Sequence, residues 1–329
     1  MLKSPLKKDR RRMGRRTMAE SKNFDIIIVG GGPAGLACGQ YSARAGRNTV
    51  IIEEMAPGGQ AMIIDEIENY PGLEKISGYE LASKFEQQAT GFGCQIAYAT
   101  VNSVNRLEDG SFSLDTSDGE YLSPVVVIAT GAKHRNLEVP GEKEMIGHGV
   151  SYCATCDGPF FRKKKILVCG GGDSACQESM YLRKLSDDVT VTHRRDRFRA
   201  QASIVKAMED AGIKTKMNTQ VLSINSENNK VRSVTFLDKA SGQTYTEEFD
   251  GVFIFVGSIP QTQLVPDCEK DESGFIKTDS HMMTSIPGMY AIGDVRDTAF
   301  RQIVTAAADG AVAAHYASEY IDARNNNSY

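Results

Sequence analysis

The most reactive side chains in the sequence are two cysteines separated by two residues. Cys153 and Cys156 form a C-x-x-C segment, and Asp157 follows directly. This spacing lets two sulfurs meet in a small ring and favours the thiolate of one cysteine, which is the species that exchanges disulfides. A neighbouring carboxylate can give a proton to a leaving thiolate or to a flavin, or take one from it. We therefore predict that Cys153, Cys156 and Asp157 are catalytic in disulfide exchange.

Each of these assignments has an alternative. The cysteine pair could be half of a zinc site, which needs a second pair or histidines at ligand spacing. The sequence has no second C-x-x-C and its five histidines are scattered, so we predict no metal. Asp157 could be a turn residue before Gly158.

The remaining cysteines follow no disulfide framework, because the chain has an odd total of seven at irregular spacing. Such residues are typical of small buried hydrophobic positions. A reducing, cytoplasmic compartment fits this usage best. The residues concerned are Cys38, Cys94, Cys169, Cys176 and Cys268.

A first dinucleotide site is predicted by Gly30-x-Gly32-x-x-Gly35 after an apolar run. In such a motif the first glycine makes a tight turn, the second lets the backbone approach a pyrophosphate, and the third lets helix and strand pack closely. Glu53 lies 21 residues after Gly32, at the end of the next predicted strand. A carboxylate there accepts hydrogen bonds from a free ribose.

A second dinucleotide site is predicted by Gly170-x-Gly172-x-x-Ala175. Here the matching strand ends in basic residues, and Arg194 lies 22 residues after Gly172. A guanidinium at this position suits the 2′-phosphate of NADP. The alternative for Arg194 and its neighbours Arg195 and Arg199 is a solvated basic patch.

Two different dinucleotides in one chain imply electron transfer between them. FAD is the natural partner of NADPH, because a flavin accepts hydride and can deliver electrons to sulfur. The sequence therefore predicts FAD and NADPH as cofactors, and a cysteine pair that accepts the electrons.

The secondary structure that positions these motifs is two β-α-β units. The first comprises a strand at 26–29, a helix at 34–45 and a strand at 48–52, and the second comprises 165–169, 174–184 and 188–193. Strands at 125–129 and 252–256 each run into a glycine, where we expect the chain to cross between domains, and a last helix is expected at 304–320. The predicted fold class is α/β, with two Rossmann-like dinucleotide-binding domains, the NADPH domain being inserted into the FAD domain.

Composition and charge are those of an ordinary globular protein, with 41% hydrophobic and 24% charged residues among 329. No apolar run approaches the roughly 18 residues of a membrane-spanning helix. The formal net charge is -4, although residues 1–17 alone carry eight basic side chains and one acidic one. The acidic remainder argues against general nucleic-acid binding. We interpret the basic arm as disordered, with nucleic acid, anionic lipid or targeting as alternatives.

On these motifs the sequence resembles the low-molecular-weight, bacterial-type thioredoxin reductases, which are FAD- and NADPH-dependent pyridine nucleotide-disulfide oxidoreductases. The similarity covers about residues 24 to 322, and its most specific part is VSYCATCDG at 150–158, inside the NADPH domain. In the broader disulfide reductase group the cysteines lie in the flavin domain. Other matching segments are GGGPAG (30–35), GGQ (58–60), ENYPG (68–72), ATGA (129–132), GGGDSA (170–175), HRRDRFRA (193–200) and AIGDVRD (291–297) with RQIVTAAADGAVAA (301–314).

The resemblance implies site residues for both cofactors. The implied FAD contacts are Gly30, Gly32, Pro33, Ala34, Gly35, Glu53, Glu54, Gly59, Gln60, Asn69, Ala129, Thr130, Gly131, Gly293, Asp294, Arg301, Gln302 and Ile303. The implied NADPH contacts are Gly170, Gly172, Asp173, Ser174, Ala175, Glu178, His193, Arg194, Arg195 and Arg199.

The resemblance also implies the reaction and the organisation of the chain. Electrons pass from NADPH through FAD and the cysteine pair to the disulfide of thioredoxin; Cys156 faces the flavin, Cys153 attacks the substrate and Asp157 is the acid. The protein is a cytoplasmic homodimer whose NADPH domain rotates against the FAD domain, with no nucleic-acid or membrane partner. The expected parts are the arm at 1–22, the FAD domain at 23–134 and 257–323, the NADPH domain at 135–256 and a tail at 324–329.

Several other functions remain as alternatives. A flavin disulfide reductase with another electron donor, such as ferredoxin, would not need Arg194, Arg195 and Arg199, and neither would a flavin oxidase that makes disulfides. The flavoprotein of an alkyl hydroperoxide reductase would need a further N-terminal redox domain. A non-enzymatic redox sensor or a nucleic-acid binder is the alternative from another class.

Overall fold

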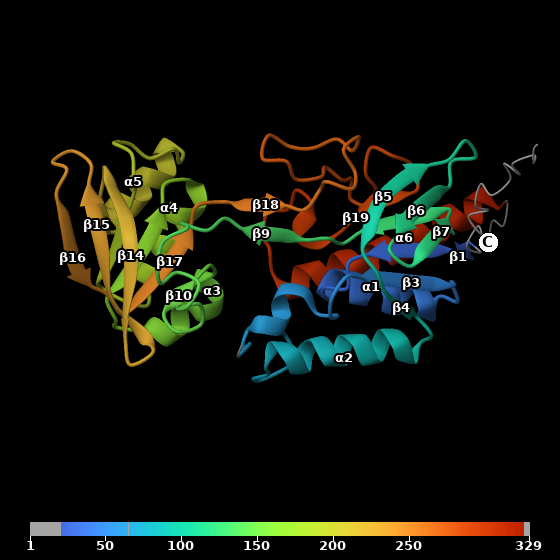
Figure 1. Ribbon diagram of the computed structural model, residues 1–329, viewed down its shortest axis with the longest axis horizontal. Helices are drawn as coiled ribbons and strands as arrows, with labels where there is room; N and C mark the ends of the chain where they lie inside the picture. The colour runs from blue at the N-terminus through green and yellow to red at the C-terminus, as the bar shows by residue number, and fades with distance from the viewer. Residues whose placement is uncertain (1–20, 65, 326–329) are drawn as a thin grey trace, which may run out of the picture.

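The computed structural model describes residues 21–64 and 66–325, and it places them in two domains joined by a narrow connection (Figure 1). The first domain contains both ends of the described chain. The second is inserted between its halves, as the sequence predicts. Residues 1–20 of the predicted basic arm lie outside the described residues.

The first domain is built on a five-stranded parallel sheet in the order β19-β8-β2-β3-β4. Its central strands are short runs of Ile and Val that are buried on both faces, as is usual in parallel sheets. The strands are β2 (Ile26–Val29), β3 (Thr49–Glu53), β4 (Gln95–Tyr98), β8 (Val125–Ile128) and β19 (Met289–Ala291).

Alternate residues of these strands enter two different cores. Ile26 and Ile28 face a helical layer, whereas Ile27 and Val29 face an antiparallel sheet. The helical layer consists of α1 (Pro33–Arg44), α2 (Gly78–Gly91) and α6 (Ile303–Arg324), with the 3-10 turns η1 (Gly59–Ile63) and η3 (Gly293–Val295). The antiparallel sheet consists of β5 (Val101–Arg106), β6 (Phe112–Thr116) and β7 (Gly119–Ser123), with β1 (Lys22–Asn23) added parallel to β7.

The inserted domain repeats this three-layer plan. Its parallel sheet has the order β10-β17-β11-β12-β13, from β10 (Val150–Ser151), β11 (Ile166–Gly170), β12 (Val189–Thr192), β13 (Lys214–Lys216) and β17 (Gly251–Phe255). One face packs on α4 (Asp173–Arg183) and α5 (Ala202–Asp210). The other packs on the antiparallel strands β14 (Thr219–Glu227), β15 (Lys230–Asp238) and β16 (Thr244–Glu248). The short helix α3 (Ala154–Asp157) and the turn η2 (Gly158–Phe161) complete the domain.

A two-stranded antiparallel ribbon connects the domains. The chain leaves the first domain through β9 (Ala132–His134) and returns through β18 (Ser258–Pro260), and the two strands pair with each other over three residues. The strands β8 and β17 lead directly into this ribbon, which confirms both predicted crossing points (Figure 1).

The predicted strands and helices are confirmed, with ends that differ by a few residues. The glycine motifs do not predict α2, α5 or the two antiparallel sheets, which consist of short amphipathic segments. Two boundaries are corrected. Lys22, assigned to the arm, pairs in β1 and forms an ion pair with Asp118, and Arg324, assigned to the tail, is the last residue of α6.

The described residues contain no helix that is long and apolar enough to cross a membrane.

The close packing of α1 on the turn after β2 leaves no room for a side chain at Gly35. A Cβ on Gly35 would overlap the carbonyl oxygen of Gly30, whereas a Cβ on Gly91, at the end of α2, would meet nothing within 4 Å. Overpacking typically costs about 1–3 kcal/mol. Gly35→Ala should therefore lower the melting temperature and the flavin content, and Gly91→Ala should leave both nearly unchanged. Equal melting temperatures for the two variants would contradict this account of the turn.

Candidate active site

A single cavity of about 2080 Å³ runs between the two domains and contains most of the predicted site residues. It is lined by the glycine turn after β2, the glycine turn after β11 and the cysteine pair. Four predicted site residues are not part of its lining: Gly35, Asp157, Asp173 and Ala175. The structure thus brings two motifs that are 140 residues apart to one space.

The first glycine turn is shaped by close backbone contact. Gly30 has a φ of 107°, and a Cβ there would lie 2.5 Å from the carbonyl oxygen of Ala129. Gly32 forms the N-cap of α1 without a side-chain cap, and the space beside its Cα is open. The unpaired amides of the first helical turn therefore border the cavity, in the arrangement that binds a pyrophosphate. Gly35 packs closely against Gly30, which explains its absence from the lining.

Glu53 holds this turn in place. Its carboxylate accepts hydrogen bonds from the backbone N–H groups of Gly31 at 2.7 Å and Met55 at 3.0 Å. Carboxylate oxygens have further lone pairs, so Glu53 can still accept from a ribose. The sequence does not reveal this structural role of Glu53, because the groups that bind its carboxylate are backbone N–H groups.

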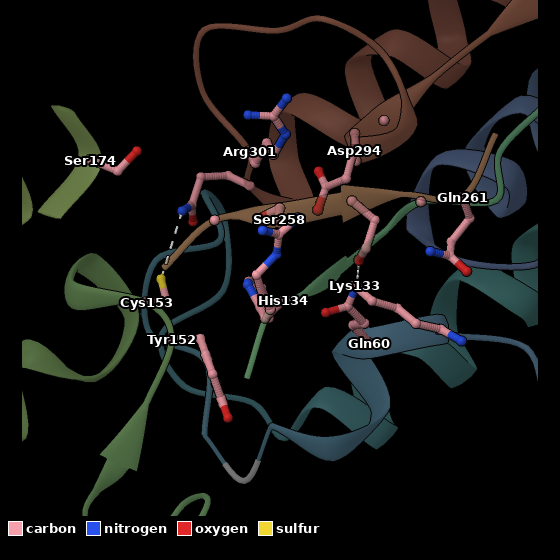
Figure 2. Close-up of a pocket in the computed structure, with 18 of the residues that line it drawn as sticks. Gln60, Lys133, His134, Tyr152, Cys153, Ser174, Ser258, Gln261, Asp294 and Arg301 are labelled. Atoms are coloured by element: carbon pink, nitrogen blue, oxygen red, sulfur yellow. Dashed lines mark hydrogen bonds between the residues drawn. The ribbon is translucent and has the colours of Figure 1, made fainter. Parts of the chain in front are cut away.

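Arg301 and Asp294 form a charged group at the N-terminal end of α6 (Figure 2). The Arg301 guanidinium lies 4.0 Å from the centre of the Phe275 ring, and its buried Nε has no hydrogen-bond partner. Burial raises the pKa of Asp294, while Arg301 opposes that shift. Burial likewise lowers the pKa of Arg301. An unpaired buried donor beside a lined cavity fits a polar ligand at this place. The first site as a whole therefore fits FAD.

The second glycine turn has the same construction. A Cβ on Gly170 would lie 2.5 Å from the carbonyl oxygen of Phe255 and 2.6 Å from the Cβ of Ala175, so Ala175 packs against the turn. Gly172 is the N-cap of α4, again without a side-chain cap and with open space beside its Cα. The Asp173 carboxylate accepts from the backbone and side chain of Gln201, so it has a structural role, and its contact with the cofactor stays a prediction.

Charged groups around this second turn lack protein partners. Arg194, Arg195 and Arg199 are exposed, line the cavity and form no ion pair with any described carboxylate. His193 is buried with an unpaired Nε2, and its pKa is lowered by burial and by the three arginines. The buried Oε2 of Glu178 is also unpaired, and burial raises the pKa of this carboxyl group. Unpaired guanidiniums and orphaned polar atoms on a cavity wall fit a phosphorylated dinucleotide.

Cys153 and Cys156 form a disulfide at the start of α3. Cys153 is the N-cap, and its Sγ accepts a hydrogen bond from the backbone N–H of Cys156 at 3.2 Å. Such a bond favours the thiolate of Cys153 in the reduced pair. Asp157 follows the pair, with its backbone N–H bonded to the carbonyl of Cys153 at 3.2 Å.

The disulfide lies against the first domain. Gln302 Nε2 donates to Thr155 Oγ1 at 3.3 Å and lies 4.0 Å from Cys153 Sγ (Figure 2). Asn69 Nδ2 in turn donates to Gln302 Oε1 at 3.1 Å. Gln302, predicted as an FAD contact, therefore binds the cysteine segment of the inserted domain, and Asn69, also predicted as an FAD contact, holds Gln302.

Several residues of the site were missed because their segments match no nucleotide motif. Tyr152 stacks on His134 of the ribbon, with ring centres 5.1 Å apart, and its hydroxyl donates to Glu142. Thr130 Oγ1, a predicted contact, donates to the carbonyl of Gln261. Tyr152, His134, Gln261 and Phe275 all line the cavity. The only sequence signal for these residues is that they are aromatic or polar and lie near the motifs.

The other five cysteines are buried and unbridged, as predicted. Burial raises the pKa of Cys176 to about 11, and those of Cys38 and Cys94 to about 12, which keeps these thiols protonated and unreactive. Among the described residues no group of His, Cys, Asp or Glu side chains has the arrangement of a metal site.

Comparison with known proteins agrees with this geometry. Residues 24–310 match the family of pyridine nucleotide-disulphide oxidoreductases. The thioredoxin reductase of Treponema pallidum is 49% identical over 92% of this chain and 99% of its own length. That of Bacillus subtilis is 40% identical over 93% of this chain and 97% of its own length.

Solved structures agree as well. The thioredoxin reductase of Streptococcus pyogenes has a TM-score of 0.85 at 43% identity, covering 92% of this chain and all of its own. The Lactococcus lactis enzyme in its FR conformation has a TM-score of 0.62 at 43% identity, covering 91% of this chain and 99% of its own. The chain therefore belongs to the pyridine nucleotide-disulphide oxidoreductase family, within its group of bacterial-type thioredoxin reductases.

Proposed function

We propose that this protein reduces the disulfide of a thioredoxin with electrons from NADPH, by way of FAD and the Cys153–Cys156 pair. The observation that carries this proposal is the single cavity that joins two dinucleotide-type glycine turns to a disulfide. The similarity to thioredoxin reductases supports thioredoxin as the substrate.

FAD would be held in the first domain. The α1 N-terminus would bind its pyrophosphate, Glu53 a ribose, and the residues around Arg301 and Gln302 the part nearest the disulfide. Bound FAD supplies a carrier that accepts a hydride and passes an electron pair on to sulfur. The chain's own contribution is to place Cys153 and Cys156 beside that end of the cavity, through the contacts of Gln302 with Thr155 and Cys153.

NADPH would be held in the inserted domain. The α4 N-terminus would bind the pyrophosphate, while Arg194, Arg195 and Arg199 would neutralise the 2′-phosphate. The three guanidiniums line the cavity and form no ion pair with the carboxylates of residues 21–64 and 66–325, so binding a phosphate breaks no ion pair among these residues.

The cysteine pair would carry out the exchange step. Two electrons and two protons convert the disulfide to two thiols. One thiolate then attacks the disulfide of the partner and forms a mixed disulfide, which the second thiol resolves; the pair is reoxidised and the partner leaves as a dithiol. Asp157, next to Cys156, would supply or accept the proton. The N–H bond to Cys153 Sγ supports Cys153 as the attacking thiolate.

Cys153 and Cys156 are half-buried, and Gln302 of the first domain lies against the pair. We propose that the inserted domain turns on the β9–β18 ribbon, which is the narrow connection between the domains. The Streptococcus pyogenes and Lactococcus lactis structures support this motion: their identities to the chain are equal at 43%, whereas their TM-scores are 0.85 and 0.62. A homodimer in the cytoplasm is proposed from the resemblance to this enzyme group.

The proposed function is tested with the purified protein. It should be yellow, contain one FAD per chain and, with no artificial electron acceptor present, oxidise NADPH only when a thioredoxin disulfide is supplied. A ferredoxin-fed reductase would instead reduce thioredoxin without NADPH when reduced ferredoxin is supplied as the electron donor. Flavin content by absorbance and NADPH oxidation at 340 nm against a panel of thioredoxins and small disulfides are the measurements. A folded, colourless protein that takes up no FAD would overturn the proposal.

The assignment of NADPH to the inserted domain predicts how the loss of Arg194 and Arg195 changes KM for NADPH. Replacing Arg194 and Arg195 together by Ala should raise KM for NADPH, because a charged phosphate contact contributes about 1.5–3 kcal/mol, or roughly tenfold at the low end. KM for NADH should change little. Arg197→Ala is the matched control, since Arg197 is exposed in the same loop but does not line the cavity. Equal use of NADPH and NADH by the unmodified enzyme would contradict the assignment.

The exchange step predicts the behaviour of single cysteine variants. Cys153→Ser and Cys156→Ser should each lose thioredoxin turnover, because attack and resolution need both thiols. Each should keep FAD and still reduce ferricyanide with NADPH, since neither nucleotide site is changed. Cys156→Ser should trap a covalent complex with thioredoxin, visible on a non-reducing gel. Trapping by Cys153→Ser alone would reverse the order of the thiols, and retained turnover in either variant would remove the pair from the mechanism.

A further inference from the structure

The loop that carries the unpaired arginines is held mainly by its backbone. This arginine loop, residues 193–201, follows β12 and contributes Arg194, Arg195 and Arg199 to the cavity wall. None of these three side chains forms a hydrogen bond or ion pair within the described residues. Their positions therefore depend on where the loop backbone is fastened.

The second half of the loop is fastened to the glycine turn. The N–H of Arg199 donates to the carbonyl of Gly171 at 2.7 Å, and the N–H of Gln201 donates to Asp173 Oδ1 at 2.7 Å. Both anchors belong to the start of α4. They set the distance between Arg199 and the α4 N-terminus.

The first half is fastened to the turn between β13 and β14. The N–H of His193 donates to the carbonyl of Lys216 at 2.9 Å, and the N–H of Thr219 donates to the carbonyl of His193 at 3.0 Å. Between them, the N–H of Asn218 donates to the carbonyl of Arg195 at 2.9 Å. Of these three bonds, only that of Asn218 holds an arginine of the cavity wall.

Asn218 makes this bond from an unusual backbone conformation. Its φ is 53°, in the left-handed region that Asn and Gly adopt with little strain and that branched side chains avoid. Its carbonyl accepts from the N–H of Lys239 at 2.8 Å, so the residue is held on both sides. Asn218 does not itself line the cavity. Its N–H can point at Arg195 only while this conformation is kept.

We infer that Asn218 is a positioning residue for cofactor selectivity: its left-handed conformation holds the backbone of Arg195, and so places the arginine loop to bind a 2′-phosphate. The inference rests on the proposed use of NADPH. A residue acting in this way affects the ligand with the 2′-phosphate and leaves the ligand without it largely untouched, because the α4 N-terminus is shared by both.

The test uses two variants and one matched control in the flavin-loaded protein. Asn218→Val cannot adopt the left-handed conformation without strain, whereas Asn218→Gly can. Asn229→Val introduces the same strain at the β14–β15 turn of the same domain, where Asn229 has a φ of 58° and lies outside the cavity lining. Dissociation constants for NADP⁺ and NAD⁺ are measured by calorimetry, with melting temperatures alongside.

Asn218→Val should weaken NADP⁺ binding about tenfold, the equivalent of losing one charged phosphate contact, and change NAD⁺ binding less than about twofold. Asn218→Gly and Asn229→Val should both bind NADP⁺ as the unmodified protein does. The inference is overturned if Asn218→Val keeps its preference for NADP⁺, if it loses both ligands equally, or if Asn229→Val shows the same selective loss. An unmodified protein that binds NADP⁺ and NAD⁺ equally would instead refute the proposed cofactor, which separates the two failures.

Discussion

The structure depends on one constraint: two nucleotide-binding domains must share a cavity while being joined by only a pair of short strands. The ribbon of β9 and β18 meets this constraint with pairing over three residues, from Ala132–Pro260 to His134–Ser258. Because β8 and β17 both end at this ribbon, the carboxyl ends of both parallel sheets open toward the space between the domains. Ligands of open α/β sheets bind at that edge, so the two glycine turns and the disulfide come to line one cavity.

The two sites differ in how their charged groups are held, and the difference suits their proposed ligands. In the first site the charged groups are partly buried and packed: Glu53 holds backbone amides, and Arg301 lies over Phe275 near the buried Asp294, with its Nε unpaired. In the second site the guanidiniums are exposed and unpaired, and the order comes from backbone anchors at Gly171, Asp173 and Asn218. The first arrangement is preorganised for a resident cofactor, and the second leaves charges available for a ligand that enters and leaves.

The contact between the domains is small and polar. Gln302 reaches Thr155 and Cys153 and is itself held by Asn69, while Tyr152 stacks on His134 of the ribbon. Hydrogen bonds of this kind contribute only about 0.5–1.5 kcal/mol each, so they can close and open within a catalytic cycle. This suits the proposed motion, in which the cysteine pair meets the cofactor in one arrangement and a protein disulfide in the other.

Much of this could be predicted from local sequence. A glycine motif specifies its turn through backbone sterics within about six residues, and the short span of a C-x-x-C lets its two sulfurs meet. Both glycine turns, their strands and the paired cysteines were therefore predicted from the sequence. The two antiparallel sheets, α2 and α5 were not predicted, because short amphipathic segments take their structure from the surface they cover.

Glu53 and Asp173 show the same limit: each is near a motif, yet tertiary structure turns each carboxylate to a backbone N–H, of Gly31 for Glu53 and of Gln201 for Asp173. The arginine loop was visible as basic residues, but the anchor at Asn218 depends on a hydrogen bond between segments 23 residues apart, and the contact of Gln302 with Cys153 spans 149. The sequence motifs alone determined which chemical groups this protein has. The positions of these groups relative to one another depend on long-range packing and hydrogen bonds, which no local sequence pattern encodes.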